Sequence, residues 1–312
     1  MSLPQVPLGN TGLMVSRFCF GTLTIGPWQA NLPLPEGAAL IRRALEAGVN
    51  FIDTAELYRT YDYIRLALGA WPEPVVIATK SYAVSARQME ESLAAAQRGL
   101  NRDQVEVFLL HEQESALTLR GHGDALRVLV RAKEQGIIKA IGISTHCVAG
   151  VRAAITHPEI DVIHPLVNVA GLGIADGTRE EMVQAISEAR AVGKGVYLMK
   201  PLGGGNLLPR AVEALQYAVT APADAVAVGV KTAAELDFDL SFFQPGKRPA
   251  APPITGKRLR VEPYCRACGE CGRACPTGAI AVQGGRAKVD HTRCILCGYC
   301  AARCPEFCLR VY

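Results

Sequence analysis

Short apolar runs alternate with amphipathic stretches over the first three quarters of the chain. Several of the amphipathic stretches repeat apolar residues at the spacing of one helix face, and the apolar runs have the length of buried strands. The predicted strands are Phe18–Gly21, Phe51–Asp53, Val75–Lys80, Val105–His111, Ala140–Ser144, Val162–Pro165, Val196–Lys200 and Ala225–Gly229. The predicted helices include Glu36–Ala47, Ala86–Arg98, Asp124–Gln135 and Arg179–Val192. Eight alternations over about 230 residues predict an α/β fold, a parallel (β/α)8 TIM barrel.

A glycine directly follows each of these four helices, at Gly48, Gly99, Gly136 and Gly193. Glycine readily adopts the left-handed conformation that ends many helices, so we expect all four to be C-terminal caps. The competing architecture is an open, doubly wound sheet. Its usual G-x-G-x-x-G motif does not follow the first predicted strand, which favours the barrel.

Nine of the eleven cysteines lie between Cys265 and Cys308. Eight of them form two identical runs, Cys265-x₂-Cys268-x₂-Cys271-x₃-Cys275-Pro276 and Cys294-x₂-Cys297-x₂-Cys300-x₃-Cys304-Pro305. This spacing is typical of proteins with two [4Fe–4S] clusters, in which the fourth cysteine of each run ligates the other cluster. The predicted ligands are Cys265, Cys268, Cys271 and Cys304 for cluster I, and Cys294, Cys297, Cys300 and Cys275 for cluster II. Residues from about 260 to 312 resemble bacterial two-cluster ferredoxins, small α+β domains.

Two other uses of these cysteines fit less well. Zinc ribbons have paired C-x₂-C knuckles, but not a third cysteine at the same spacing and a fourth before proline. Disulfides would need an oxidising compartment that no other feature supports. Cys308 is surplus to the eight ligands, and Cys19 and Cys147 are expected to be small core residues.

The positive charge is concentrated at the C-terminal end. Residues 245–312 hold 12 of the 33 Lys and Arg residues but only 4 of the 29 Asp and Glu residues. Basic tails often bind nucleic acid, but this one lacks the aromatic platform on which bases stack. We expect no nucleic-acid partner, and interpret the cations as offsetting the negative charge of the thiolate-bound clusters.

Other features of the composition place the protein in a broad class. The chain has 312 residues, of which 49% are apolar and 20% charged, enough for one large domain and one small one. No apolar run approaches the roughly 20 residues of a membrane-spanning helix, and the first residues do not resemble a signal peptide. We expect a cytoplasmic protein without membrane contact. The expected organisation is a barrel at 1–244, a proline-rich linker at 245–258 and a ferredoxin-like domain at 259–312.

Polar residues end three consecutive predicted strands, where the active sites of barrel enzymes are built. Asp53, Lys80 and His111 end these strands, and Tyr58 follows the first of them in FIDTAELY. Together with the N-terminal segment VPLGNTGLMVSRFCFGT, these motifs make residues 5–236 resemble an aldo-keto reductase. The four residues match the catalytic tetrad of that family one by one.

The resemblance implies a chemistry. Tyr58 would be the general acid that protonates the oxygen of a small-molecule carbonyl substrate. Lys80 would lower the pKa of Tyr58, Asp53 would keep Lys80 charged, and His111 would orient the carbonyl. The alternative is that Asp53 and Lys80 form only a buried ion pair. Trp28, Tyr61 and Tyr82 are candidates for the pocket wall.

The resemblance also implies contacts to NADP(H) or NAD(H). Ser144, Thr145 and Asn168 would meet the nicotinamide, and Gly21 and Thr22 would face the cofactor. The glycine-rich loop after the seventh predicted strand would meet the pyrophosphate through Lys200, Pro201, Leu202, Gly203 and Gly204. Lys231 and Thr232 occupy the position that grips an adenosine 2′-phosphate. Acidic Glu235 and Asp237 replace the arginine that often follows, so the choice between NADP and NAD stays open.

A hydride carries two electrons, whereas each cluster accepts one, so a converter such as a flavin is needed between them. One hypothesis is an aldo-keto-reductase-like enzyme that receives electrons from a ferredoxin or flavoprotein partner, through FMN or another flavin. A second is an NAD(P)H-dependent reductase whose clusters are structural or sensory. A third is an electron-transfer subunit with a non-catalytic barrel. The intact tetrad argues against the third hypothesis, and two complete cluster motifs argue against a purely structural use.

Overall fold

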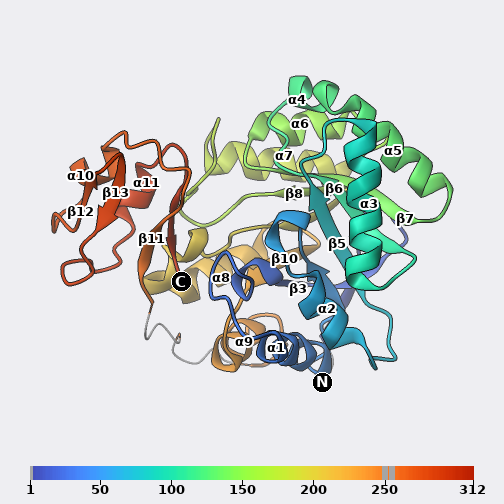
Figure 1. The fold of residues 1–312 in the computed structure, drawn as a ribbon, viewed down its shortest axis with the longest axis horizontal. Coiled ribbons are helices and arrows are strands. Elements are labelled where there is room, and N and C mark those ends of the chain that lie inside the picture. Colours follow the sequence, from blue (N-terminus) through green and yellow to red (C-terminus); the bar gives the residue numbers. More distant parts are fainter. Residues whose placement is uncertain (1–2, 248–251, 253–256) are drawn as a thin grey trace.

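The computed structural model describes residues 3–247, 252 and 257–312. Residues 248–251 and 253–256, within the expected linker 245–258, lie outside the described residues. Eight parallel strands close into a barrel in the order β10-β3-β4-β5-β6-β7-β8-β9 (Figure 1). They are β3 (Phe18–Gly21), β4 (Phe51–Asp53), β5 (Val76–Ser81), β6 (Val105–Leu110), β7 (Ile138–Thr145), β8 (Val162–Pro165), β9 (Gly195–Leu198) and β10 (Ala225–Gly229). The predicted (β/α)8 barrel is confirmed.

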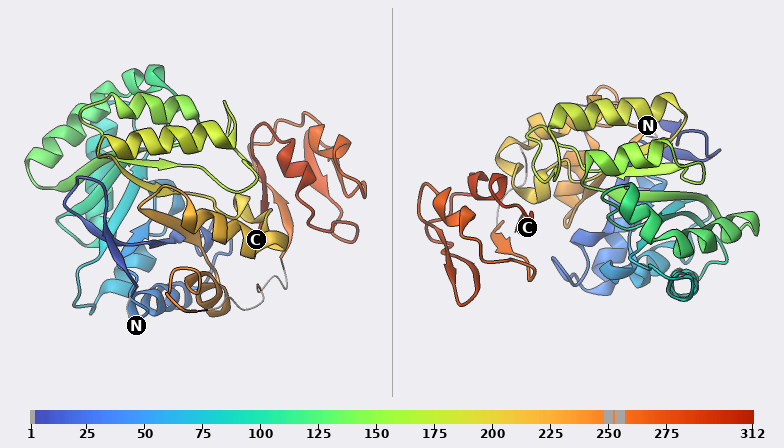
Figure 2. Two further views of the ribbon diagram at one scale, coloured as in Figure 1. Left: turned by 180° about the vertical axis from the view of Figure 1, so that it is seen from behind. Right: turned by 90° about the horizontal axis from the view of Figure 1, so that it is seen from above.

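Helices cover the outside of the barrel (Figure 2). They are α1 (Leu34–Glu46), α2 (Tyr61–Leu68), α3 (Ala86–Leu100), α4 (Ala116–Gly121), α5 (Gly123–Glu134), α6 (Val148–Ile155), α7 (Arg179–Ala191), α8 (Ala211–Thr220) and α9 (Ala233–Leu240). Capping boxes begin α3 at Ser85 and α7 at Thr178, where a hydroxyl accepts a hydrogen bond from a backbone amide of the first turn. None of the helices in these described ranges combines the length and apolar content that crossing a membrane requires.

Three of the four predicted glycine caps are correct, because Gly48, Gly136 and Gly193 have φ of 94°, 74° and 85°. The prediction for Gly99 is wrong, because this residue lies inside α3 and Asn101, with φ of 54°, ends the helix. Gly99 has a packing role instead. A Cβ there would lie 2.7 Å from the ring of Tyr61, so glycine lets α2 approach α3 closely.

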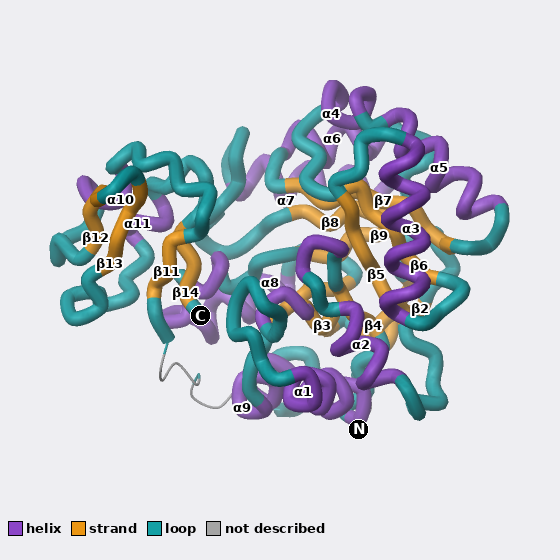
Figure 3. The backbone as a smooth tube through the Cα atoms, viewed as in Figure 1, coloured by secondary structure: helices purple, strands orange, loops and turns teal. Residues whose placement is uncertain are grey.

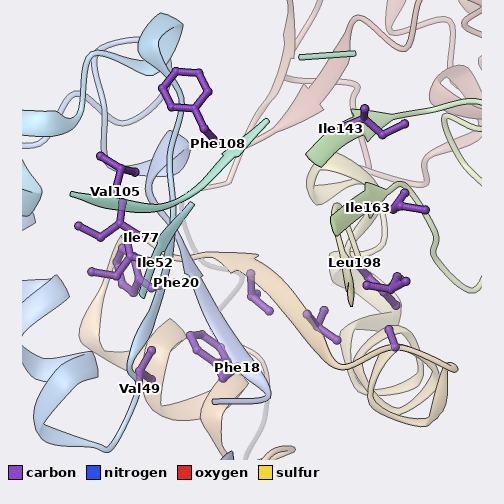
Figure 4. Close-up of a cluster of buried hydrophobic side chains, with 14 of the residues drawn as sticks. Phe18, Phe20, Val49, Ile52, Ile77, Val105, Phe108, Ile143, Ile163 and Leu198 are labelled. Atoms are coloured by element: carbon purple, nitrogen blue, oxygen red, sulfur yellow. The ribbon is translucent and has the colours of Figure 1, made fainter. Parts of the chain in front are cut away.

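Side chains alternate between the two faces of the barrel strands. Phe18 and Phe20 point outward under the helices, in the core that Figure 4 shows, whereas Cys19 between them belongs to the barrel interior. A hairpin of β1 (Gln5–Pro7) and β2 (Met14–Ser16) precedes the barrel, and Leu8 packs into the same interior cluster. The interior is therefore a packed core, and the hairpin covers the end of the barrel at which the strands begin.

Because side chains alternate along a strand, the inward-facing rows also place polar residues at the upper end of the barrel, where the strands end. On β5, Val76 and Ala78 face the interior, and Lys80 is the next residue on that face. On β6, Val107 and Leu109 face the interior, and His111 follows them. The polar cluster at the strand ends thus continues the inward-facing rows of the core.

The C-terminal module lies beside the barrel, shown in red in Figures 1 and 2. Its elements are β11 (Leu259–Val261), α10 (Glu270–Arg273), β12 (Ile280–Gln283), β13 (Arg286–Val289), α11 (Tyr299–Ala302) and β14 (Leu309–Val311). The strand pairs β11–β14 and β12–β13 are antiparallel, and the members of each pair lie side by side in Figure 3. The two cysteine runs have matching backbones: Gly269 and Gly298 have φ of 81° and 80°, and Ala267 and Leu296 have φ of 56° and 54°.

The module docks on the barrel through β14 and the loop that follows β9. The side-chain amide of Asn206 donates a hydrogen bond to the Leu309 carbonyl over 2.9 Å. A Cβ on Gly205, whose φ is 85°, would lie 1.8 Å from the Val311 carbonyl oxygen. Gly205 is therefore required here, because a larger residue would separate this loop from β14.

Candidate active site and cluster module

Asp53 and Lys80 form a buried ion pair at the upper end of the barrel. Lys80 Nζ donates to both carboxylate oxygens of Asp53, over 2.7 and 2.8 Å, and to the Thr54 carbonyl over 2.7 Å. The Lys80 side chain is 1% exposed and that of Asp53 is 7% exposed. An ammonium has three donors, and these three bonds use all of them.

Tyr58 lies next to this pair, on the short 3₁₀ turn Glu56–Tyr58 that follows β4. Lys80 Nζ is 5.0 Å from the centroid of the Tyr58 ring, so the ammonium faces the ring rather than the hydroxyl. Burial, followed by the negative charge of Asp53, raises the pKa of Tyr58 well above its usual value, and the positive charge of Arg310 opposes this. The expected lowering of this pKa is wrong here, because burial and the negative charge of Asp53 outweigh the nearby positive charge. Tyr58 is therefore held protonated, as a proton donor must be.

His111 completes the group of four. Its ring centroid is 5.9 Å from that of Tyr58 and 4.2 Å from that of Tyr82, on which it stacks. Burial and the charges of Lys80 and Lys200 lower the pKa of His111, which keeps the imidazole neutral. Its buried Nδ1 has no hydrogen-bond partner. The structure thus brings the four predicted tetrad residues together and leaves one of them with a free ring nitrogen.

Two further residues support Asp53 from the opposite side of the barrel. The hydroxyl of Tyr197 on β9 donates to Asp53 Oδ1 over 2.9 Å, and its ring stacks on His164 at 3.9 Å. His164 Nε2 is 3.6 Å from the same oxygen. Sequence reasoning missed Tyr197. Its signal is an inward-facing hydroxyl in an otherwise apolar strand.

Of the candidates for the pocket wall, Tyr82 and Trp28 are half exposed, at 45% and 44%. The Tyr312 hydroxyl donates to the Trp28 carbonyl over 3.4 Å, so the chain end reaches this side of the barrel. Tyr61 is instead a packing residue, whose hydroxyl bonds to Thr79 over 2.8 Å.

Residues expected to meet the nicotinamide are buried at the barrel end and have internal partners. Ser144 Oγ accepts from the Glu112 amide over 2.9 Å, and Thr145 Oγ1 accepts from the Cys147 amide over 2.9 Å. The Asn168 side chain donates to the Leu172 carbonyl over 2.9 Å and accepts from the Leu172 amide over 3.0 Å.

Gly21 and Thr22, expected to face the cofactor, also have partners within the chain. The Thr22 hydroxyl donates to the Asp53 carbonyl over 3.0 Å, and Gly21 packs against the Val228 backbone.

The loop expected to meet the pyrophosphate carries part of the C-terminal module. Its sequence positions are Lys200, Pro201, Leu202, Gly203 and Gly204. A Cβ on Gly204 would lie 2.8 Å from Arg310 Nη1, so the guanidinium lies directly on this loop. Lys200 Nζ is 2.6 Å from His146 Nε2 and 5.3 Å from the Phe307 ring centroid.

The position expected to grip a 2′-phosphate holds a carboxylate of the chain itself. Glu235 Oε2 accepts from the Lys231 amide over 2.7 Å, and Thr232 Oγ1 accepts from the Glu235 amide over 3.1 Å. Lys257, beyond the linker, forms an ion pair with the other oxygen of Glu235. The Lys231 amide and the Thr232 hydroxyl are thus engaged by Glu235, and Arg310 lies on the pyrophosphate loop.

The eight predicted cluster cysteines line two separate cavities. One is lined by Cys265, Cys268, Cys271 and Cys304 among other residues. The other is lined by Cys294, Cys297, Cys300 and Cys275. Within the described ranges, no three His, Cys, Asp or Glu side chains converge as the ligands of a single metal ion do. Each cavity therefore collects three cysteines of one run and the fourth of the other, a donor set that fits a [4Fe–4S] cluster.

Backbone amides point at cysteine sulfurs in both cavities. Cys275 Sγ accepts from the Ala279 amide over 3.2 Å, and Cys304 Sγ accepts from the Cys308 amide over 3.4 Å. A hydrogen bond from the Cys308 thiol, 3.4 Å away, lowers the pKa of Cys304 to about 6. Cys308 thus supports a ligand as a thiol donor, and the arrangement suits thiolates, the form that binds metal.

Sequence reasoning also missed Phe307 and Arg310. These residues follow the second cysteine run and lie at the barrel mouth, the end of the barrel that holds Tyr58 and His111. Phe307 is 4% exposed, and its ring centroid is 6.2 Å from that of His146. The Arg310 guanidinium lies 4.0 Å above the Phe307 ring. The available signal was the repeat itself: Phe307 and Arg310 align with Gly278 and Ala281 of the first run, two small exposed residues.

Comparison with protein families assigns both parts of the chain. Residues 17–239 match the model of the aldo/keto reductase family. The chain belongs to that family. Residues 258–305 match a 4Fe-4S dicluster domain, so the reductase barrel is followed by an iron–sulfur module. The family consists of oxidoreductases that use a nicotinamide cofactor.

Individual relatives are distant. Methylglyoxal reductase DkgA of Yersinia pestis is 28% identical over 184 residues, which is 56% of this chain and 65% of the relative. An NADH-specific methylglyoxal reductase of Escherichia coli is 27% identical over 188 residues, 52% of this chain and 58% of the relative. The chain thus spans just under two thirds of the length of these curated relatives. Aldo-keto reductase AKR11C1 from Bacillus halodurans shares the fold, with a TM-score of 0.65, 19% identity and coverage of 80% of this chain and 92% of that one.

Proposed function

We propose that this aldo/keto reductase family member interconverts a small-molecule carbonyl and its alcohol in the barrel mouth, with electrons passing through the C-terminal clusters. The observation that carries the proposal is the segment from Cys304 to Arg310. It joins a predicted ligand of cluster I to the barrel mouth, where Phe307 packs on Lys200 and His146. A module that only stabilised the fold would not need to extend into the mouth of the barrel.

The residues of the mouth have complementary tasks in this reaction. Tyr58 gives its proton to the carbonyl oxygen as a hydride reaches the carbon, and its raised pKa keeps that proton available until then. The neutral His111 offers a ring nitrogen to the same oxygen. The ion pair of Lys80 with Asp53 holds the ammonium over the Tyr58 ring, and the positive charge of Arg310 favours the phenolate that forms on Tyr58.

The clusters supply the electron chemistry when they are bound. Each [4Fe–4S] cluster exchanges one electron, so the two together would carry the two electrons of a carbonyl reduction. A ferredoxin or flavoprotein partner would load the clusters, and a flavin would collect the two electrons with a proton from solvent and pass them to the carbon as hydride. Arg310 lies on the loop after β9, which supports electron entry through the module.

A steady-state assay under anaerobic conditions tests the proposal. Purified protein is given methylglyoxal, the substrate named for the relatives, with either chemically reduced ferredoxin or NADPH and NADH as the electron source. We expect consumption of the carbonyl with reduced ferredoxin and little with the nicotinamides. Acid extraction of the same preparation identifies any flavin. Turnover with NADPH alone, at undiminished rate after the clusters are removed, would refute the proposal.

A further inference from the structure

Arg310 is a buried cation without a carboxylate partner, although its charge also acts on the Cys304 thiol, a predicted ligand of cluster I. It is 9% exposed, and its Nη1 atom has no hydrogen-bond partner. Its other terminal nitrogen reaches only the Tyr264 hydroxyl, over 3.4 Å. Within the described part of the chain, it forms an ion pair with no carboxylate. A buried guanidinium with an unsatisfied donor is costly, so such an arrangement calls for a ligand.

The surroundings of Arg310 are positive. Lys200 is close enough that the Arg310 charge, after burial, lowers its pKa well below the usual value. Burial and the charges of Lys200 and Arg310 lower the pKa of His146 in the same way. Of the nearby carboxylates, Glu112 is bonded to Tyr82 over 2.6 Å and Glu262 receives the Tyr312 hydroxyl over 3.4 Å. Within the described residues, neither carboxylate forms an ion pair with Lys200 or Arg310, and both act on these cations from a longer distance.

The position of Arg310 is specific to the second half of the module. Its counterpart in the first cysteine run is Ala281, which is exposed, and the counterpart of Phe307 is the exposed Gly278. Phe307 keeps the left-handed backbone of that glycine, with φ of 46° against 60°. A bulky residue is strained in this conformation, and its ring supports the Arg310 guanidinium at 4.0 Å. On the barrel side, Gly204 leaves the space that Arg310 Nη1 occupies.

We propose that Arg310, with Lys200 beside it, is a carboxylate-binding subsite that the iron–sulfur module contributes to the barrel mouth. The substrate class is then a carbonyl compound with a neighbouring carboxylate, such as a 2-oxo acid. This inference rests on the proposed function, since it names the substrate of the same mouth. A guanidinium suits the task because its planar fork binds both oxygens of a carboxylate.

Arg310 also lies on the same side as the proton donor. Its charge is close enough to act on the pKa of Tyr58. A carboxylate on Arg310 would therefore fix the orientation of the adjoining carbonyl with respect to Tyr58 and His111. The barrel alone lacks this subsite, which gives the module a role in substrate recognition besides electron transfer.

Binding to the complete protein with oxidised clusters tests this subsite without turnover. Calorimetric titrations use three anionic probes, pyruvate, phenylpyruvate and 2-oxoglutarate, and the uncharged methylglyoxal. The variants are Arg310→Gln and Arg310→Lys. Arg303→Gln is the control, because it removes an exposed charge from the same module. Cluster absorption and circular dichroism verify that each variant is folded and loaded.

We expect at least one 2-oxo acid to bind, with Arg310→Gln weakening it about tenfold or more and Arg310→Lys weakening it less. Methylglyoxal binding should be the same in all variants, and Arg303→Gln should change neither probe. Three results would overturn the subsite: no binding of any anion, equal losses for charged and uncharged probes, or unchanged anion binding in Arg310→Gln. Because the clusters stay oxidised, these results are independent of whether the electron route proposed above is correct.

Discussion

Lys80 faces the ring of Tyr58, with its ammonium nitrogen 5.0 Å from the ring centroid, while Asp53 and Thr54 take all its protons. The lysine thus has no proton left for a hydrogen bond to the Tyr58 hydroxyl. Tyr58 is left with a protonated hydroxyl beside the neutral His111.

Replacement of Tyr58 by phenylalanine should therefore remove the proton donor and keep the packing. We expect carbonyl turnover to fall by about 10²–10⁴-fold, the usual contribution of a general acid. Cluster content and thermal unfolding should be unchanged. Steady-state rates with reduced ferredoxin measure the effect, and a variant with full activity would show that another group delivers the proton.

The ion pair of Lys80 with Asp53 should be sensitive to removal of one partner. Lys80→Met leaves a buried carboxylate without a counter-charge, so we expect the free energy of unfolding to fall by about 3–5 kcal/mol. The double variant Asp53→Asn/Lys80→Met should recover much of this loss. Arg87→Met, in an exposed pair with Glu91, is the control and should change the free energy of unfolding little. Urea denaturation measures all three, and a loss for Lys80→Met no larger than that of the control would contradict the buried pair.

His164 should make stability depend on pH. Burial lowers its pKa to about 3, against about 6.5 in the unfolded chain. Between these values the unfolded state binds the proton and the folded state does not, so stability falls as the pH falls. We expect His164 to contribute about 1.4 kcal/mol per pH unit below pH 6, in addition to His111 and His146, so His164→Gln should reduce the slope by that amount and the exposed control His291→Gln should leave it unchanged. Equal slopes in the two variants would show that His164 contributes nothing.

The crossed arrangement of cysteines makes a prediction about iron content. Cys304→Ala should reduce the iron from about eight atoms per chain to about four, because it removes a ligand of one cluster only. Cys308→Ala should retain both clusters, since this cysteine lies 3.4 Å from Cys304 as a donor to its sulfur. The double variant shows whether Cys308 can replace the lost ligand. Eight irons in the double variant would contradict the assignment.

Much of the fold follows from local patterns in the sequence. All eight barrel strands were predicted to within two residues at each end, because buried strands are apolar runs separated by amphipathic helices. Asp53, Lys80 and His111 were found because each extends an inward-facing row at a strand end. Tyr197 was missed because its hydroxyl lies within an apolar run, and only the closed barrel brings it to Asp53.

Contacts between distant segments could not be read in this way. Glu235 was recognised as an unusual acid, but its pairing with Lys257 depends on the course of the chain after the barrel. Arg310 appeared to be one of many tail cations until β14 placed it on Gly204. Such contacts come from docking between two parts of the chain, which leaves no periodic pattern in either sequence.

The central claim is that electrons held by the clusters reach a carbonyl in the barrel. The most direct measurement is a single turnover: the protein is reduced anaerobically, freed of reductant, and mixed with a carbonyl compound while the cluster absorption is followed. We predict that the absorption of oxidised clusters returns with formation of the alcohol in the unaltered protein, and far more slowly in Tyr58→Phe. Clusters that stay reduced in the presence of a carbonyl compound that the protein is known to bind would contradict the claim.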